Sequence, residues 1–290
     1  MMDSPKHVYE YDIDLDSDVA PARVIRMVHR GSKVLEIGAG PGSITRHLSG
    51  TLGCDVVALE IDPSAIEKLT PFARKIYSLD LNDGSWAKVL EAEQGKFDAV
   101  IAADVLEHVY DPWAVLRGMK SLLNDTGSVI LSIPHVGHAS IVGCLFDEDF
   151  EYRPWGLLDK THIRFFGIKN IQNLFNAQGL AIEHSEFVVR TPEMTEFAAR
   201  WQRLPANIRQ AAQTNRFSHV FQVVSRAVPV ERAKTDLRLT DLEVPPPDRA
   251  TINYWTKTMK RIPSPKGEDI TSTAIVGQRS TLAKLFERWN

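Results

Sequence analysis

Three glycines at alternate positions are the residues of this chain whose spacing first points to chemistry. Gly38, Gly40 and Gly42 follow directly on the apolar run 34–37, and a helix is predicted to open at Ser43. Glycine reaches positive φ and has no Cβ, so such a bend between a strand and a helix lets the backbone press against a ligand. The bend therefore predicts a nucleotide-like cofactor. A dinucleotide site would need its third glycine at position 43, where this chain has serine.

An acidic residue ends the next predicted strand. The segment 55–61 is apolar up to Glu60, which follows the glycines at about the distance where Rossmann-type folds hold a ribose. A carboxylate accepts hydrogen bonds from both ribose hydroxyls. We therefore predict that Glu60, with Ile61 beside it, binds the cofactor. Asp62 is the second choice, and an ordinary strand-end charge is the alternative.

The pattern that starts at Glu36, E-x-G-x-G-x-G, resembles motif I of class I S-adenosylmethionine-dependent methyltransferases. The run 97–109, with its acid and Glu-His pair, is similar to the fourth-strand motif of the same family. The resemblance covers residues 10–228 and implies that S-adenosylmethionine is the cofactor. The cofactor residues that it implies, beyond those already named, are Glu36, Asp80 with Leu81 on the adenine side, Asp104, and Tyr11, which with Tyr9 is expected to form a lid.

Histidine is the side chain best suited to take a proton from an acceptor hydroxyl near neutral pH. Of the nine histidines, four lie on segments expected at the ligand edge of the sheet: His108, His135, His138 and His162. The segment 133–166 resembles a bacterial branch of the family often found beside glycosyltransferases and acting on sugars or other small metabolites. We predict His162 as the general base and His135 as the second choice. The alternative for His162 is a structural role beside the helix predicted near residue 168.

A metal site is not predicted. His135, His138 and the acidic residues 147–149 invite the idea, because some O-methyltransferases hold a divalent cation against a catechol. However, the two histidines lie on a predicted loop that fixes no ligand geometry, and the branch that the chain resembles is not metal-dependent.

Composition is that of an ordinary globular protein, with 290 residues, 43% of them hydrophobic and 24% charged. The net charge of −3 gives no electrostatic footprint for nucleic acid or for an anionic membrane surface. Cys54 and Cys144 form no spacing motif and are predicted to be buried, reduced thiols of a cytoplasmic protein. The N-terminus lacks the apolar region of a secretory signal. The apolar stretch 128–146 is predicted to be a buried strand plus loop.

The elements that must position these residues alternate along the chain. A first helix, capped by Ser17 or Asp18 and running to about His29, precedes predicted strands at 33–38, 55–61, 75–79, 97–103, 127–133 and 180–190. Such alternation with helices predicts an α/β fold with a parallel sheet covered on both faces. The resemblance adds an antiparallel seventh strand at 217–228, between the fifth and the sixth, which gives a Rossmann-like seven-stranded sheet.

Two long connections, 134–166 and 191–216, leave the carboxyl ends of predicted strands, where open parallel sheets bind ligands. With the N-terminal lid and helix (1–30), they are predicted to form the substrate pocket of a domain spanning 1–230. In the second insert, apolar residues recur at helical spacing and are expected to pack the insert onto the domain, with contact to substrate as the alternative: Met194, Phe197, Ala198, Trp201 and Leu204.

Residues 231–290 are predicted to form a C-terminal extension. Pro245-Pro246-Pro247 indicates a stiff linker, and a short helix is predicted at 280–289. That helix is expected to dock on its own domain, or alternatively on a second protein or subunit, so a homo-oligomer is one possible partner arrangement.

The sequence thus predicts a methyltransferase for a small-molecule acceptor, such as a sugar, a phenol or a related metabolite, with methylation at oxygen. An N-methyltransferase and a cofactor-binding subunit or scaffold without turnover are the alternatives. Neither nucleic acid nor membrane is a predicted partner. An NAD-dependent oxidoreductase is disfavoured for two reasons. The third glycine does not stand at position 43, where a dinucleotide site needs it, and the chain has no Tyr-x-x-x-Lys motif.

Overall fold

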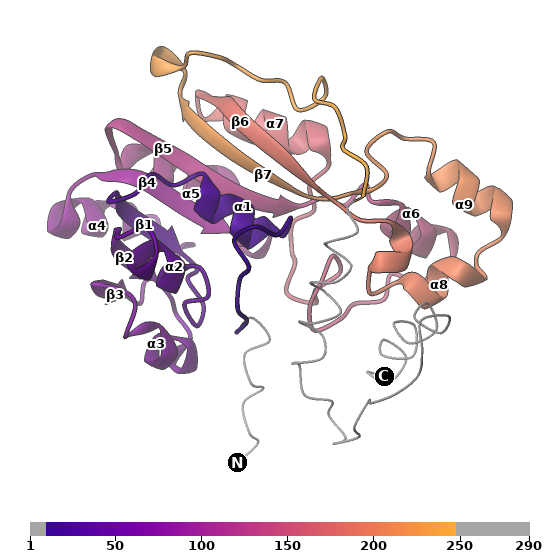
Figure 1. The fold of residues 1–290 in the computed structure, drawn as a ribbon, viewed down its shortest axis with the longest axis horizontal. Coiled ribbons are helices and arrows are strands. Elements are labelled where there is room, and N and C mark those ends of the chain that lie inside the picture. Colours follow the sequence, from indigo (N-terminus) through magenta and orange to yellow (C-terminus); the bar gives the residue numbers. More distant parts are fainter. Residues whose placement is uncertain (1–9, 248–290) are drawn as a thin grey trace.

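The computed structural model describes residues 10–247, and within them seven strands form one sheet in the order β3-β2-β1-β4-β5-β7-β6 (Figure 1). The strands are β1 Lys33–Ile37, β2 Asp55–Leu59, β3 Lys75–Tyr77, β4 Phe97–Ala103, β5 Leu123–Pro134, β6 Leu180–Val189 and β7 Val220–Pro229. Strands β1 to β5 pair in parallel, and β7 runs antiparallel between β5 and β6. The predicted Rossmann-like sheet with an antiparallel seventh strand is confirmed.

Helices cover both faces of this sheet, because successive side chains of each buried strand point to opposite sides. On β1, Leu35 and Ile37 share one core with α4, α5 and α7, whereas Val34 belongs to another core with α1 and α2. The α-helices of the described residues are α1 Ala20–Arg26, α2 Thr45–Gly50, α3 Pro63–Leu69, α4 Trp86–Gln94, α5 Pro112–Ser121, α6 Ala139–Phe146, α7 Ile168–Ala177, α8 Ala198–Arg203 and α9 Ala206–Ala212. Short 3-10 turns are η1 Leu106–His108, η2 Pro192–Met194 and η3 Val230–Arg232.

The first helix differs from its prediction. Helix α1 is preceded by Val19 at the N-cap, and no side chain caps it, so the prediction of a cap at Ser17 or Asp18 was wrong. The helix also ends at Arg26, before His29. A cap normally accepts from the second or third helical N–H, and Pro21 occupies one of the first two helical positions, where it offers no donor.

The apolar stretch 128–146 contains more regular structure than predicted. It comprises the end of β5 and helix α6, which follows the strand after the short turn 135–138. The His138 side chain caps α6 by accepting a hydrogen bond from the Ser140 N–H. None of the helices between residues 10 and 247 combines the length and the apolar character needed to cross a bilayer.

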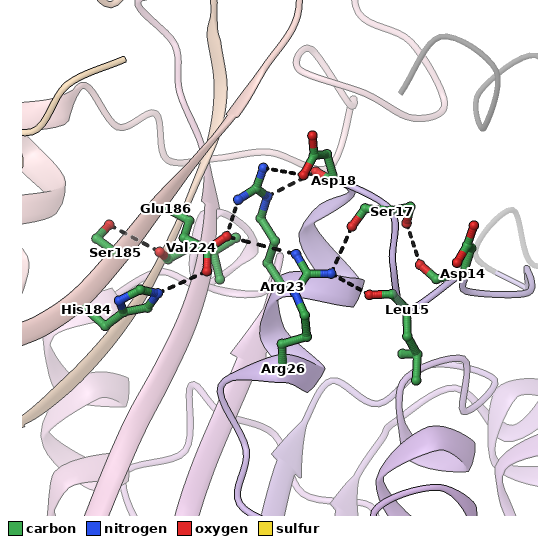
Figure 2. A network of polar contacts seen from close by, with 10 residues as sticks. All are labelled: Asp14, Leu15, Ser17, Asp18, Arg23, Arg26, His184, Ser185, Glu186 and Val224. Carbon is green, nitrogen blue, oxygen red and sulfur yellow. Dashed lines mark hydrogen bonds and ion pairs between the residues drawn. The ribbon is translucent and has the colours of Figure 1, made fainter. Parts of the chain in front are cut away.

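The segment before α1 is fastened to the sheet by arginines of that helix, as Figure 2 shows. Arg23 forms ion pairs with Asp18 and with Glu186 on β6, and its side chain is only 11% exposed. Arg26 donates to the backbone carbonyl of Ser17. These contacts fix the course of the chain just after the predicted lid.

The second insert packs against the first. Figure 1 shows α6, α8 and α9 gathered off the carboxyl end of β5. Phe197 and Trp201 are fully buried there, in contact with residues of α6. The predicted packing role of this apolar stripe is therefore confirmed for the residues from Phe197 to Leu204.

The chain after β7 stays on the domain beyond the predicted boundary at residue 230. The Leu237 N–H donates to the Ile182 carbonyl (2.8 Å), Leu239 is fully buried, and Val244 still packs against the main core. Cys54 and Cys144 are buried free thiols, as predicted. Tyr9 and the helix predicted at 280–289 lie outside the described residues.

Candidate active site

The glycine bend after β1 has the backbone that the sequence predicted. Gly38, Gly40 and Gly42 have φ values of 65°, 54° and 86°. A Cβ at Gly38 would lie 2.7 Å from Val105 Cγ2, and one at Gly42 would lie 3.0 Å from Phe72 Cδ2. A Cβ at Gly40 would meet nothing within 4 Å. The outer glycines are therefore required by packing, whereas Gly40 faces open space in which a ligand can lie against the backbone.

Glu60 lies directly on this bend. Its Oε2 accepts a hydrogen bond from the Gly40 N–H (2.7 Å), and its Oε1 accepts from the N–H groups of Ile61 (2.8 Å) and Asp62 (2.9 Å). Three backbone donors thus fix the carboxylate at the end of β2, beside the open side of Gly40. The Ile61 side chain is 63% exposed next to it, which leaves an apolar surface for a flat ring. Asp62, the second choice for the ribose, is used as the N-cap of α3.

Two further predicted cofactor residues follow β3. Asp80 is exposed, and its Oδ1 accepts hydrogen bonds from the backbone N–H (2.8 Å) and the side-chain amide (2.9 Å) of Asn82. Leu81 packs in part against the main core. The carboxylate is thus oriented by a turn at the edge of the sheet where β1 and β2 also end.

The N-terminal segment crosses the start of α2. The Tyr11 N–H donates to Ser43 Oγ (3.3 Å), and the Tyr11 carbonyl accepts from Arg46 (2.9 Å). Ser43 directly follows the last glycine of the bend. Tyr11 is therefore held close to the predicted cofactor residues, which is the placement that a lid requires.

Glu36 lies behind the bend. It is 2% exposed, and its Oε2 accepts a hydrogen bond from Thr45 Oγ1 (2.7 Å), which ties β1 to α2. Burial raises the pKa of Glu36 to about 8; the Thr45 hydrogen bond opposes this rise and the charge of Glu60 adds to it. In this structure Glu36 supports the bend from below.

This buried acid predicts a pH-dependent stability. The folded pKa lies above the unfolded value of 4.5, so the folded protein keeps a proton that the unfolded chain loses between about pH 4.5 and 8. Stability falls as pH rises through that window, by up to about 1.4 kcal/mol per pH unit. Glu36→Gln keeps an acceptor for Thr45 without the charge. We expect the melting temperature of Glu36→Gln, relative to that of the parent at the same pH, to rise from pH 5 to pH 8. A difference between the two proteins that does not change with pH would contradict this account.

Asp104 ends β4 in a left-handed conformation, with φ of 55°. Its carboxylate accepts hydrogen bonds from Ser132 Oγ (2.8 Å) and from the Gln222 side-chain amide (2.8 and 2.9 Å). Burial raises the pKa of Asp104, and these two partners oppose the rise. Because the next residue, Val105, packs on Gly38, Asp104 is fixed beside the glycine bend.

The structure joins His162 to the Glu-His pair that follows β4. The possible metal-ligand atoms of Glu107, His108 and His162 all lie within 4.8 Å of one another, and His162 Nε2 is 3.8 Å from Glu107 Oε1. The two imidazole rings meet edge to face at 4.7 Å between centroids. Backbone hydrogen bonds bring the loop here, since the N–H groups of Ile163 and Arg164 both donate to the Glu107 carbonyl (2.9 and 3.0 Å). We call these three side chains the Glu107 cluster.

Burial sets the protonation of this cluster. It raises the pKa of Glu107 well above the ordinary value, with Asp104 and Asp159 adding to the rise. It lowers the pKa of His162 to about 4, aided by His108, so His162 is neutral near pH 7. The Nδ1 of His162 lies 3.2 Å from the Leu157 carbonyl, which can only accept, so Nδ1 carries the proton and Nε2 presents a lone pair.

The other two candidate histidines are held differently. His138 uses both ring nitrogens, with Nδ1 at Ser140 Oγ (2.7 Å) and Nε2 at the Arg190 carbonyl (2.8 Å), and burial lowers its pKa to about 3. His138 is therefore a structural residue. His135 is buried with its Nδ1 3.0 Å from the Val220 carbonyl, and burial lowers its pKa as well.

From the sequence, we considered a metal site formed by His135, His138 and the acidic residues 147–149. In the structure both histidines and two of the acids are bound to other partners. His138 has no nitrogen left to offer. Arg200 pairs with Asp147 (2.8 Å) and with Asp149, so these acids stabilise an arginine. Glu107, by contrast, was not among the predicted site residues. The sequence feature that could have pointed to Glu107 is its position in a short segment between the apolar residues Leu106 and Val109.

Comparisons with known proteins give one family. The model of a family described as "Methyltransferase domain" matches residues 15–185. A ubiquinone biosynthesis O-methyltransferase of Xanthomonas campestris is 34% identical over 113 residues, which are 37% of this chain and 45% of that protein. Its counterpart in Xanthomonas oryzae is 31% identical over 104 residues, 35% and 43% of the two chains. The matches thus span less than half the length of these curated relatives.

Solved structures of similar fold share little sequence with the chain. A TehB-like SAM-dependent methyltransferase from Corynebacterium glutamicum has a TM-score of 0.44 and 18% identity, covering 72% of this chain and 87% of that one. A magnesium protoporphyrin IX methyltransferase from Synechocystis has a TM-score of 0.44 and 16% identity, covering 69% and 74%.

Proposed function

Since the model of the methyltransferase domain family matches residues 15–185, the chain belongs to that family, and we propose that it transfers a methyl group from S-adenosylmethionine to a hydroxyl of a small molecule. One observation carries the proposal. Gly40 combines a positive φ, open space where a Cβ would stand, and an N–H bound to the Glu60 carboxylate.

The residues present fit this donor. S-adenosylmethionine supplies a methyl group on a positively charged sulfur, and transfer to a hydroxyl leaves the bonding electron pair on sulfur and requires loss of the hydroxyl proton. Three backbone N–H groups fix Glu60 beside Gly40, and its Oε2, which accepts only one of these hydrogen bonds, has a lone pair left for a sugar hydroxyl. Ile61 offers an exposed apolar surface for the purine. Asp80 and Asp104 lie at the carboxyl ends of the neighbouring strands, and Tyr11 reaches across from the N-terminal segment. Glu36 contributes by holding the bend in place.

We place the acceptor hydroxyl at the Glu107 cluster, where His162 presents the lone pair of a neutral imidazole. His135 remains the second candidate, on a strand end with one ring nitrogen engaged. Methylation at oxygen is supported by the curated relatives, which are named O-methyltransferases. The acceptor class that we propose is a sugar, phenol or related metabolite, and the cytoplasm is the proposed compartment, in keeping with two buried free thiols. A homo-oligomer and membership of the branch associated with glycosyltransferases are also part of the proposal.

Calorimetry with the full chain tests the donor. We expect S-adenosylmethionine to bind with one site per chain and NAD to show no heat at the same concentrations. Binding of NAD alone would overturn the assignment. Labelled S-adenosylmethionine incubated with a panel of phenols, sugars and amines then tests the acceptor, because label on amines only would make the chain an N-methyltransferase. Donor binding without transfer to any member of a broad panel would favour the cofactor-binding subunit.

A further inference from the structure

We propose that the Glu107 cluster binds one divalent transition-metal ion, and that this ion holds and acidifies the acceptor hydroxyl. The second half of this proposal rests on the proposed function, whereas the first half does not. The metal set is different from the one that the sequence invited, because it joins η1 to a loop more than fifty residues later in the chain.

Glu107 is the strongest element of the site. Its side chain is 0% exposed, and no other residue in the described part of the chain donates a hydrogen bond to either of its carboxylate oxygens. A buried carboxylate without partners is costly to the fold, and native proteins normally pair such a charge or bind a metal with it. The neutral imidazole of His162 has its Nε2 3.8 Å from Glu107 Oε1, which is too far for a hydrogen bond.

The surroundings of Glu107 add negative charge. Asp104 and Asp159 both act on it electrostatically, and no lysine or arginine within residues 10–247 forms an ion pair with it. A proton on Glu107 would remove its own charge, but no other described residue would bind its second oxygen, and the neighbouring carboxylates Asp104 and Asp159 would keep their negative charge beside it. A divalent cation would compensate all of them at once.

The two histidines are oriented as metal ligands are. His108 Nδ1 faces the Thr161 carbonyl (3.2 Å), and His162 Nδ1 faces the Leu157 carbonyl (3.2 Å). Because a carbonyl can only accept, each Nδ1 carries the proton and each Nε2 keeps its lone pair for a ligand. Backbone carbonyls hold the outer nitrogen of metal-bound histidines in this way. Thr161 is itself fixed, since its hydroxyl donates to Asp159 (2.7 Å).

The spacing suits an ion between the three groups. Bonds from a transition metal to imidazole nitrogen and carboxylate oxygen are each about 2.1 Å long, so two ligands of one ion lie up to about 4.2 Å apart. The Glu107 to His162 separation of 3.8 Å falls within that span. The widest pair allowed by the cluster, 4.8 Å, needs closure by about half an ångström, which a small side-chain rotation provides.

The ligand types indicate which metal. Two imidazoles and one carboxylate favour ions such as Zn²⁺, Fe²⁺, Co²⁺ or Mn²⁺ over Mg²⁺ and Ca²⁺, which prefer oxygen ligands throughout. Three protein ligands also leave coordination positions open for a substrate. An acceptor hydroxyl that fills one of them is held by its oxygen and loses its proton to water more readily. His162 would then act as a ligand and not as a general base, because the metal would acidify the hydroxyl and water would accept its proton.

The first experiment measures metal binding without donor or acceptor. Full-length protein is stripped with EDTA, dialysed, and titrated separately with Zn²⁺, Mn²⁺ and Mg²⁺ by calorimetry, and bound metal is counted by mass spectrometry. We expect one Zn²⁺ or Mn²⁺ per chain and binding of Mg²⁺ at least about tenfold weaker. Glu107→Gln and His162→Asn should each weaken Zn²⁺ binding by about 100-fold.

A matched control and a stability readout keep folding apart from ligation. On β6 the exposed His184 pairs with the half-buried Glu186, with 3.0 Å between Nε2 and Oε1, and Glu186 also pairs with Arg23. His184→Asn should therefore bind Zn²⁺ like the parent. Zn²⁺ should raise the melting temperature of the parent and of His184→Asn, and leave that of Glu107→Gln unchanged. If the stripped parent binds none of the three ions, or if Glu107→Gln binds Zn²⁺ as tightly as the parent, the metal site is ruled out.

A second experiment separates this inference from the proposed function. Methyl transfer by the stripped protein should fall at least about tenfold and return with added Mn²⁺ or Zn²⁺. Full transfer in the presence of EDTA would overturn the metal's role and keep the proposed function. Stoichiometric metal binding by a protein that neither binds S-adenosylmethionine nor transfers methyl groups would keep the site and overturn the proposed function.

Discussion

Gly40→Ala is expected to weaken the binding of S-adenosylmethionine by about 10- to 100-fold while the protein stays folded. The new Cβ would stand in the open space beside the bend, and filling a tight site with an extra carbon costs about 1–3 kcal/mol, or roughly one to two factors of ten in affinity. The Glu60 carboxylate would still accept its hydrogen bond from the N–H of residue 40. The loss of affinity therefore measures the space that the new Cβ takes from the donor. Calorimetry on both proteins measures it.

Gly53→Ala is the control for this prediction. Gly53 has φ of 67°, and a Cβ there would also meet nothing within 4 Å, so the backbone strain and the free space match those of Gly40. It precedes β2, at the end of that strand opposite to Glu60. Both variants should lose about 1 kcal/mol of stability, and only Gly40→Ala should lose affinity. Parent-like donor binding by Gly40→Ala would mean that the donor does not lie on the bend.

His162→Ala is expected to lower kcat by about 10²- to 10⁴-fold and to leave the Kd for S-adenosylmethionine unchanged. The magnitude is that of losing a group which promotes proton transfer from the acceptor, and it holds whether the imidazole takes the proton or binds a metal that acidifies the hydroxyl. Donor affinity should survive because the hydrogen-bond partner and the close acidic neighbour of the His162 side chain within residues 10–247 are Leu157 and Glu107, and neither belongs to the glycine bend or to Glu60. Steady-state transfer with saturating donor and acceptor gives kcat, and calorimetry gives Kd.

Two other histidine variants make this prediction specific. His29→Ala changes an exposed residue beyond the end of α1 and should behave as the parent does. His135→Ala tests the second candidate and should reduce kcat less than His162→Ala, because His135 is not one of the three side chains of the Glu107 cluster, where we place the acceptor. Undiminished turnover in His162→Ala, or a larger loss in His135→Ala, would move the acceptor site away from the Glu107 cluster.

The bend and the Glu60 carboxylate beside it, which form our proposed donor site, were predictable because their residues lie close in sequence or follow the ends of successive strands. A bend of three glycines after an apolar run demands positive φ, and no residue elsewhere in the chain needs to be known for that prediction. The acid after β2 follows from the parallel order of the strands, which puts their carboxyl ends on one edge. The sequence did not reveal which carboxylate would be buried. Glu36 lies inside β1 and accepts a hydrogen bond from Thr45 on α2, whereas Glu60 follows the end of β2 and accepts one from the backbone of the bend.

The acceptor side was predictable only in part. Taken by itself, the sequence determined the α/β sheet, the bend at Gly40, the edge at which ligands bind, and the candidacy of His162. Only the tertiary structure decided that Glu107 is buried with no hydrogen bond from another residue between 10 and 247, and that His162 Nε2 lies 3.8 Å from its Oε1. The reason is physical: strand and helix periodicity act over a few residues, whereas the meeting of η1 with the loop at 157–164 depends on backbone hydrogen bonds between segments far apart in the chain.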